Sequence, residues 1–204
     1  MEYFGEQYWE ALTLLTEAVW EAIGQVIIKG REVMQWFKQA TRVVCKFKTG
    51  KNNTIIWTTP NGFRVVQHRV LANDEIIRTN LGDTVRLSTT MRIDTDDIDK
   101  RGHATSIAPN FIHALDACCL QNTVNRLPHV SLAMIHDSYG THADDTAEMA
   151  RVLREEFVKV YEQNDVISNW ISEQSEKSQK EIPERPLKGN LDLQGILQSE
   201  FFFS

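Results

Sequence analysis

The first 44 residues show a long helical pattern of apolar and polar positions. Apolar residues recur with the i, i+3, i+4 spacing of one helix face over residues 7–44. They include Ala11, Leu14, Leu15, Ala18, Val19, Ala22, Ile23, Val26 and Ile27, followed by Trp36, Phe37, Ala40 and Val44. Gly24 and Gly30 each weaken a helix by ~1 kcal/mol relative to alanine, so we predict a bend near Gly30. An apolar face of this length is expected to lie in the core.

Residues 54–92 show the pattern of paired strands. Residues 54–58 and 63–67 are short apolar runs on either side of the turn Thr59-Pro60-Asn61-Gly62, which predicts a β-hairpin. A second strand pair is expected at about 75–79 and 84–91, giving a small antiparallel sheet. Five arginines are spread along it: Arg64, Arg69, Arg78, Arg86 and Arg92. A solvated strand face explains them most simply, and a phosphate-binding surface is the less favoured alternative.

A helix is predicted over residues 107–126. Pro109 fits the first turn of such a helix, and the acidic stretch before it (Asp94, Asp96, Asp97 and Asp99) reads as an exposed connection or a helix start. It lacks the central glycine and the final glutamate of a calcium-binding EF-hand loop. His113 and Asp116 are three residues apart and share one helix face. Alone, such a pair more often makes a local hydrogen bond than a ligand set.

The candidate site lies in a predicted hairpin at residues 130–142. The uncharged run that begins at Ser131 reads as a buried strand, ends in His136-Asp137-Ser138 and is followed by the turn-forming Gly140. A carboxylate at the tip of a buried strand requires a metal ion, an arginine or backbone donors nearby. Capping of the next helix by Asp137 is the weaker alternative, because Asp144 and Asp145 are better placed for it. Asp137 is therefore a candidate functional carboxylate.

The remaining chain predicts helices over residues 145–180 and a C-terminal tail over residues 189–204. Pro183 and Pro186 favour an extended connection between them. Three phenylalanines, Phe201 to Phe203, precede Ser204. Exposed aromatic residues of this kind promote association, so we expect the tail to dock on the body of the protein.

Composition excludes several classes of protein. The net charge of −6 and the pI near 5.5 give no global signature of a nucleic-acid-binding protein. The three cysteines lack a Cys-x-x-Cys spacing, which argues against a structural zinc site and favours a reducing compartment. No apolar run approaches the ~20 residues of a membrane-spanning helix. A soluble, cytoplasmic protein is expected.

Several motifs, in the same order, resemble the single-subunit DNA-directed RNA polymerases of bacteriophages. They are Ser106-Ile107-Ala108-Pro109-Asn110-Phe111-Ile112-His113, Asp116, His136-Asp137-Ser138, Gly189-Asn190-Leu191 with Ile196-Leu197, and the aromatic C-terminus. The hairpin around Trp57 and the helix around Trp20, Met34 and Trp36 also look similar. His-Asp-Ser is typical of RNA polymerases, whereas related DNA polymerases usually read His-Asp-Glu. Gly140 resembles the phage enzymes rather than their organellar relatives.

The resemblance implies an α+β fold, a polymerase palm portion with a small antiparallel sheet packed against long helices. It implies that Asp137 is one of two aspartates that hold the catalytic Mg²⁺ ions, flanked by His136 and Ser138. His113 would lie near the nascent base pair, with Asp116 on the same helix. Tyr139 and the tail residues Phe203 and Ser204 would lie close to the substrates. The implied partners are a DNA template, the nascent RNA and ribonucleoside triphosphates, in the cytoplasm of an infected bacterium.

Parts of the family pattern are not found in this sequence. The second metal-binding aspartate, the fingers helix that binds the incoming nucleotide and the promoter-binding N-terminal domain have no counterpart. The chain is therefore expected either to be one subunit of a split polymerase, completed by a second subunit, or to be a fragment of a longer gene. The alternatives to an RNA polymerase are the palm of a related DNA polymerase and a catalytically silent remnant or binding module.

Overall fold

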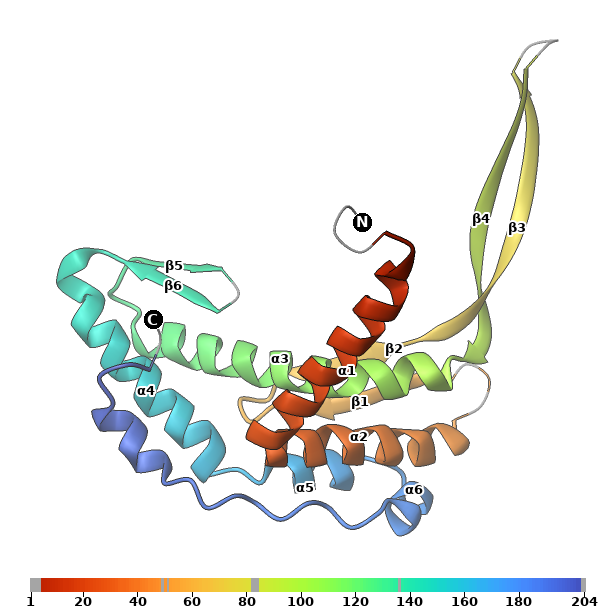
Figure 1. Ribbon diagram of the computed structural model, residues 1–204. Helices are drawn as coiled ribbons and strands as arrows, with labels where there is room; N and C mark the ends of the chain where they lie inside the picture. Colours follow the sequence, from red (N-terminus) through yellow and green to blue (C-terminus); the bar gives the residue numbers. More distant parts are fainter. Residues whose placement is uncertain (1–4, 49, 51, 82–84, 136, 203–204) are drawn as a thin grey trace.

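The computed structural model describes residues 5–48, 50, 52–81, 85–135 and 137–202 (Figure 1). The helices are α1 (Tyr8–Val26), α2 (Ile28–Lys46), α3 (Lys100–Arg126), α4 (Thr146–Glu162), α5 (Val166–Ser172) and α6 (Glu176–Glu181), with 3₁₀ turns η1 (Gly5–Gln7), η2 (Ala143–Asp145) and η3 (Leu193–Gln198). The strands are β1 (Thr54–Thr58), β2 (Arg64–His68), β3 (Val70–Leu81), β4 (Val85–Ile98), β5 (Leu132–Ile135) and β6 (Ser138–Thr141). The predicted α+β class is confirmed.

The 27-residue helix α3 runs through the middle of the molecule. It begins after Asp99, whose carboxylate accepts a hydrogen bond from the backbone amide of Gly102 at 2.8 Å. Pro109 therefore lies inside the helix, and the prediction that it occupies the first turn was wrong. The helix continues through the proline because Ile107 and Phe111, on either side of it, are buried in the core. Burial of this kind outweighs the lost backbone hydrogen bond.

An aromatic cluster joins α2, α3 and α5. The ring of Phe37 lies 4.8 Å from that of Phe111 and 5.4 Å from that of Trp170, measured between centroids. Trp36 contacts Trp170 at 5.9 Å, and Trp57 from β1 contacts Phe111 at 6.2 Å. Edge-on and tilted aromatic pairs of this kind add stability beyond the burial of their area. This cluster fixes α3 against the β1–β2 sheet and α2.

The predicted helical segment 7–44 is two helices separated by a sharp bend. The break is at Ile27 rather than at Gly30, and the two helix axes differ by 109°. The Arg31 side chain crosses closely over Gly24, where a Cβ would collide with it, and continues to the ring of Trp20. Only α2 carries buried residues, whereas α1 has none. The expectation that the whole apolar face lies in the core was therefore wrong for α1.

No single helix in the described part of the chain is both long and apolar enough to cross a membrane. Helices α1 and α2 satisfy this test of length and composition only as a bent pair.

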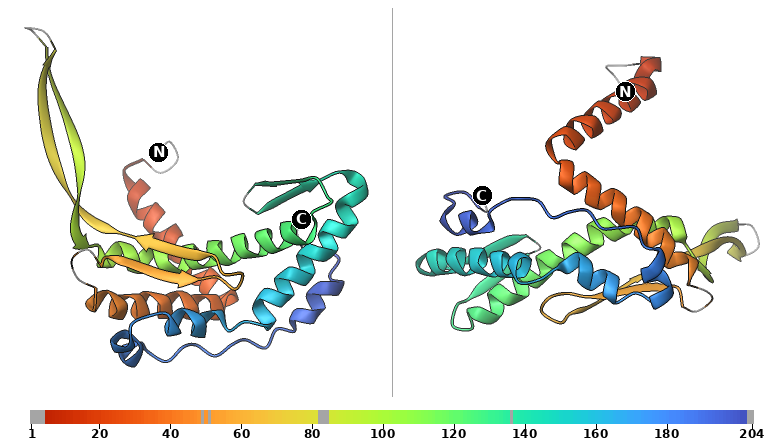
Figure 2. Two further views of the ribbon diagram at one scale, coloured as in Figure 1. Left: turned by 180° about the vertical axis from the view of Figure 1, so that it is seen from behind. Right: turned by 90° about the horizontal axis from the view of Figure 1, so that it is seen from below.

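The strands form three separate two-stranded antiparallel sheets, β1–β2, β3–β4 and β5–β6. The small antiparallel sheet is thus divided, and the hairpin with Asp137 does not join the others. Strands β3 and β4 are longer than predicted, because the pairing extends to Val70 and Ile98 and includes the acidic stretch after Ile93. Figures 1 and 2 show that β3–β4 projects from one end of α3, and that β5–β6 lies at the other end, on the same side.

The last described part of the chain crosses the body as an extended strap, residues 182–192, followed by η3. Side chains of the body bind it. The indole Nε1 of Trp36 donates to the carbonyl of Pro183 at 2.9 Å, and Arg154 donates to the carbonyl of Ser199 at 3.2 Å. In the other direction, Lys188 donates to the carbonyl of Tyr161 at 2.9 Å. The helices predicted over residues 145–180 are α4 and the two short helices α5 and α6.

A buried polar network fastens α3 to β2. His103 is fully buried, and its Nδ1 lies 2.9 Å from Nε2 of Gln67, while its Nε2 lies 3.0 Å from the carbonyl of Asn53. Asn110 donates to Oε1 of Gln67 at 2.9 Å. The Asn53 carbonyl can only accept, so Nε2 carries the proton and Nδ1 accepts from the Gln67 amide. Burial lowers the pKa of His103, and the network suits the neutral ring.

We expect stability to depend on the protonation of His103. The folded protein holds this ring neutral with a lowered pKa, so the unfolded chain binds the extra proton first as the pH falls below about 6.5. The free energy of unfolding should therefore fall with decreasing pH through that range, by at most about 1.4 kcal/mol per pH unit for one proton. Urea denaturation at several pH values measures this slope. His103→Gln should lower stability and remove the histidine part of the slope. An unchanged slope in that variant would contradict the assignment.

Candidate active site

The hairpin β5–β6 places Asp137 at an exposed tip. Ile135 pairs with Ser138, so Asp137 lies in the connection between the two strands, and its side chain is exposed. Gly140 was predicted to form the turn, but it lies within β6, opposite Ala133. A Cβ at Gly140 would approach the carbonyl oxygen of Ala133 to 3.3 Å. The tight fit between the strands explains a glycine here without a turn.

The predicted buried strand is covered on one face only. Leu132 and Tyr139 pack on a cluster formed by Leu127, Val130, Met149 and Val152, at the ends of α3 and α4. The opposite face carries Ala133 and Ile135, and Ile135 is 70% exposed. The prediction of a fully buried strand was wrong for this face. A two-stranded hairpin has one packed face here and one face open to another element.

Helix α3 brings Asp116 close to the hairpin. Both His113 and Asp116 are exposed on α3. Partial burial raises the pKa of the Asp116 carboxyl, the neighbouring His113 opposes this shift, and the negative charge of Asp137 raises the pKa further. The sequence placed His113 and Asp116 on one helix face, and the structure adds that Asp137 lies within electrostatic reach of Asp116.

Tyr139 forms the inner side of the same region. Burial raises the pKa of its phenol to about 12, and the neighbouring Cys119, Asp116 and Asp137 act in the same direction. Its hydroxyl therefore keeps its proton at neutral pH and can donate a hydrogen bond. Burial likewise raises the pKa of the Cys119 thiol to about 12, so this cysteine is an apolar filler and not a nucleophile.

A hollow of about 400 Å³ lies beside Asp137. Its lining combines the hairpin, α4 and the C-terminal tail: Asp137, Ser138, Tyr139, Thr146, Met149, Ala150, Leu153, Arg154 and Phe202. The sequence identified the hairpin residues and expected the tail nearby. It missed Arg154, since one arginine on an amphipathic helix gives no signal until the fold places it beside Asp137.

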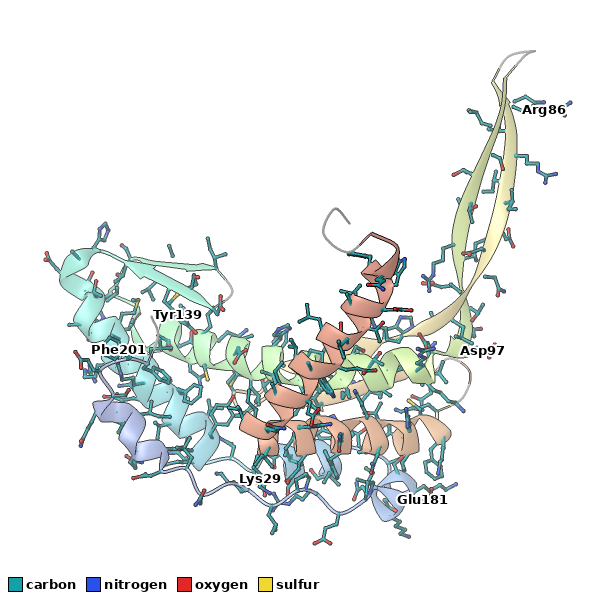
Figure 3. All side chains as sticks on the ribbon, viewed as in Figure 1. Lys29, Arg86, Asp97, Tyr139, Glu181 and Phe201 are labelled. Atoms are coloured by element: carbon teal, nitrogen blue, oxygen red, sulfur yellow. The ribbon has the colours of Figure 1, made fainter. Side chains whose placement is uncertain are left out.

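The tail docks in part as predicted. Phe202 packs edge-on against Phe157 of α4, with ring centroids 5.0 Å apart. Phe201 is 77% exposed, so the prediction of docking was wrong for that residue. Figure 3 places Phe201 and Tyr139 at the same end of the molecule. His136, Phe203 and Ser204 lie outside the described residues, and the roles expected of them stay predictions.

Among the residues that the structure describes, no group of three or more His, Cys, Asp or Glu side chains could hold a metal ion. Asp137 offers hard carboxylate oxygens of the kind that Mg²⁺ prefers, and Mg²⁺ commonly takes only one or two protein carboxylates. The described residues thus fit one part of a magnesium site.

Comparison with known proteins identifies the family. A model of the DNA-dependent RNA polymerases matches residues 1–182. The chain is 32% identical over 212 residues to T7 RNA polymerase of Escherichia phage T7, and 31% identical over 212 residues to the DNA-directed RNA polymerase of Enterobacteria phage T3; each alignment covers 96% of this chain and 24% of the relative. It is 34% identical over 189 residues to the mitochondrial DNA-directed RNA polymerase 1 of Arabidopsis thaliana, covering 90% of this chain and 18% of the relative.

The chain belongs to the phage-type single-subunit RNA polymerases. This result decides against the related DNA polymerases, the alternative that the sequence left open. The chain spans about a quarter of the length of its phage relatives. The alignments with these relatives cover nearly all of this chain. Asp137, Asp116 and His113 all lie within the residues that the family model matches.

Ion pairs join the C-terminal end of α3 to the middle of α4. Nη1 of Arg126 lies 2.8 Å from Glu155 Oε2 and 3.1 Å from Glu156 Oε1. The Glu156 side chain is only 2% exposed, and its other cation, Lys159, is 3.8 Å away. The hydrogen bond that Arg126 donates to Glu155 is the largest of the effects that raise the pKa of Arg126.

We expect Arg126→Met to lower the free energy of unfolding by about 2 kcal/mol, because it leaves the Glu156 carboxylate buried without its closest cation. Arg151→Met is the matched control, since it removes a cation that pairs with Glu155 and Glu148 at the surface. Its effect should stay within about 0.5 kcal/mol. Urea denaturation of both variants measures the difference, and equal stabilities would contradict a buried role for the Arg126–Glu156 pair.

Proposed function

We propose that this chain forms the palm part of a DNA-templated RNA polymerase and that Asp137 supplies one carboxylate to its catalytic magnesium site. The observation that carries the proposal is the position of Asp137 in a segment matched by the polymerase family. Its exposed carboxylate lies at the tip of a hairpin, beside a hollow that α4 and the tail complete. When bound, Mg²⁺ would favour attack by the RNA 3′-hydroxyl and departure of pyrophosphate.

The other residues of the region fit binding and orientation of the nucleic acid. His113 is exposed on α3, one turn from Asp116, and can donate to the acceptors that every base pair presents in the minor groove. Donation to such shared acceptors tests the shape of a pair without preferring a sequence. Tyr139 keeps its phenolic proton at neutral pH, which makes it a hydrogen-bond donor beside Asp137.

Template DNA is the implied partner of the projecting hairpin β3–β4. Arg78, Arg86 and Arg92 are exposed along it, and Figure 3 places Arg86 near its far end. Among the described residues, none of these arginines lies within 4 Å of a carboxylate. Guanidinium groups without a carboxylate partner can contact DNA phosphates. These arginines therefore favour the phosphate-binding surface that the sequence left open as the alternative to a solvated strand face.

A further polypeptide segment, in the same longer protein or in a second subunit, completes the active site in this proposal. It supplies the second metal-binding aspartate and the fingers. Two observations support it besides the missing ligands. Helix α1 exposes a row of large apolar side chains that includes Leu14, Leu15 and Val19, and the β5–β6 hairpin leaves the Ile135 face open. Both surfaces are suited to burial against another part of the polymerase.

Asp137→Asn should abolish template-directed RNA synthesis by the assembled polymerase, because the amide loses the charge that binds Mg²⁺. Residue 137 is exposed, so the fold should be unaffected. The measurement is incorporation of ribonucleotides on a DNA template, with the circular dichroism spectrum as a check of folding. Asp144→Asn, an exposed aspartate of the same region, should retain activity. Normal synthesis by Asp137→Asn would refute the metal-ligand role. An assembled wild-type protein without activity would favour a silent remnant.

Leu15→Lys should weaken association with the completing segment supplied as a separate polypeptide, because it places a charge on the exposed apolar face of α1. The chain alone should keep its stability, since α1 has no buried residue. Size-exclusion chromatography of the mixture measures the association. Glu17→Lys, an exposed change of charge on the same helix, is the control. If both variants associate like the wild type, α1 is not the contact surface.

A further inference from the structure

Arg154 stands between the C-terminal tail and the hollow at Asp137. It lies on α4, half-buried, and lines the hollow together with Asp137, Tyr139 and Phe202. Its Nη1 donates to the carbonyl of Ala150 at 3.0 Å, one turn earlier in α4. This bond holds the guanidinium against its own helix and leaves the second amino group directed at the tail.

The second amino group binds the tail directly. Nη2 of Arg154 donates to the carbonyl of Ser199 at 3.2 Å. The guanidinium carbon Cζ lies 5.7 Å from the centroid of the Phe202 ring, within the range of a cation–π contact. One side chain therefore contacts both ends of the segment 199–202. The hydroxyl of Ser199 donates to the carbonyl of Phe201 at 2.9 Å, which keeps this segment turned back on itself.

Both features of the contact require a guanidinium. A planar fork can donate from two amino groups in fixed directions and also cover an aromatic ring with its face, whereas a lysine ammonium is a compact point charge. The Phe202 ring also packs edge-on against Phe157. The tail segment thus contacts both an arginine and an aromatic residue, one turn apart on the same helix.

We infer that Arg154 is a positioning residue, which holds the tail segment 199–202 against the hollow beside Asp137. This inference rests on the proposed function, because the tail affects the reaction only if Asp137 is part of the active site. Arg154 acts through Phe202 and not by contact with the substrates. The alternative role, in which its charge binds a substrate phosphate, predicts a different pattern of variants.

The test uses four variants in the polymerase assembled from this chain and its completing segment. Arg154→Met removes the guanidinium and keeps the side-chain length, Phe202→Ala removes the ring, and the third combines both. Arg151→Met, one turn away in α4 and directed to Glu148 and Glu155, is the matched control. Two quantities are measured for each: the hydrogen-exchange rate of the amides in 199–202, and the kcat and KM for ribonucleotide addition.

We expect Arg154→Met and Phe202→Ala each to speed exchange of the tail amides and to lower kcat by about tenfold, with KM little changed, since the tail is misplaced while substrate binding remains. The double variant should be no worse than either single one, because both act by the same displacement. Arg151→Met should match the wild type in both measurements.

Three results would overturn the inference. The first is that the tail amides of Arg154→Met exchange as slowly as those of the wild type. The second is that the losses of kcat in the two single variants multiply in the double variant. The third is that Arg154→Met raises KM while kcat stays normal. The last result is that of a phosphate-binding arginine. Failure of the proposed function is distinct, because the wild-type assembly is then inactive. In that case the hydrogen-exchange rates still show whether Arg154 anchors the tail. The catalytic part of the inference would then be refuted together with the proposed function.

Discussion

Burial of one face of α3 against the aromatic cluster is the constraint on which the rest of the structure depends. Phe111 of α3 contacts Phe37 and Trp57, and these rings fix the helix along its length. The same burial fixes which residues face outward, so His113 and Asp116 occupy the exposed side. The polar network at His103 adds a second attachment near the start of the helix. A helix held at this many points can carry functional groups in defined positions.

The sequence predicted the elements better than their limits. Helical periodicity located α2 and α4, and the turn Thr59-Pro60-Asn61-Gly62 located the first hairpin. Pro109 suggested a helix start that burial of its neighbours overrode. The bend lies at Ile27, where no glycine or proline marks it, and it brings Arg31 over Gly24. Periodicity identified the apolar face of α1 correctly but could not say whether this chain covers it.

The sequence predicted those site residues that belong to a local motif. It missed the residues that only the fold brings to the site. His-Asp-Ser located Asp137 because the residues are consecutive. Arg154, by contrast, becomes part of the site because the strap brings the tail back to α4. Arg154 and its partner Ser199 are more than forty residues apart in sequence. The buried Gln67–His103–Asn110 network was missed for the same reason, since its members lie on two elements whose packing a sequence pattern does not encode.

The path of the strap depends on a small number of hydrogen bonds to the body of the protein. Trp36 and Arg154 donate to the carbonyls of Pro183 and Ser199, groups that a backbone presents whatever its side chains are. The strap also supplies donors of its own, because Arg185 donates to Asp165 and Lys188 donates to the carbonyl of Tyr161. A change at the exposed Leu187 should therefore leave the path of the strap unaltered, whereas the donors Trp36, Arg185 and Lys188 cannot be exchanged as freely. The strap is thus fastened at a few points, and the chain between them is free to differ.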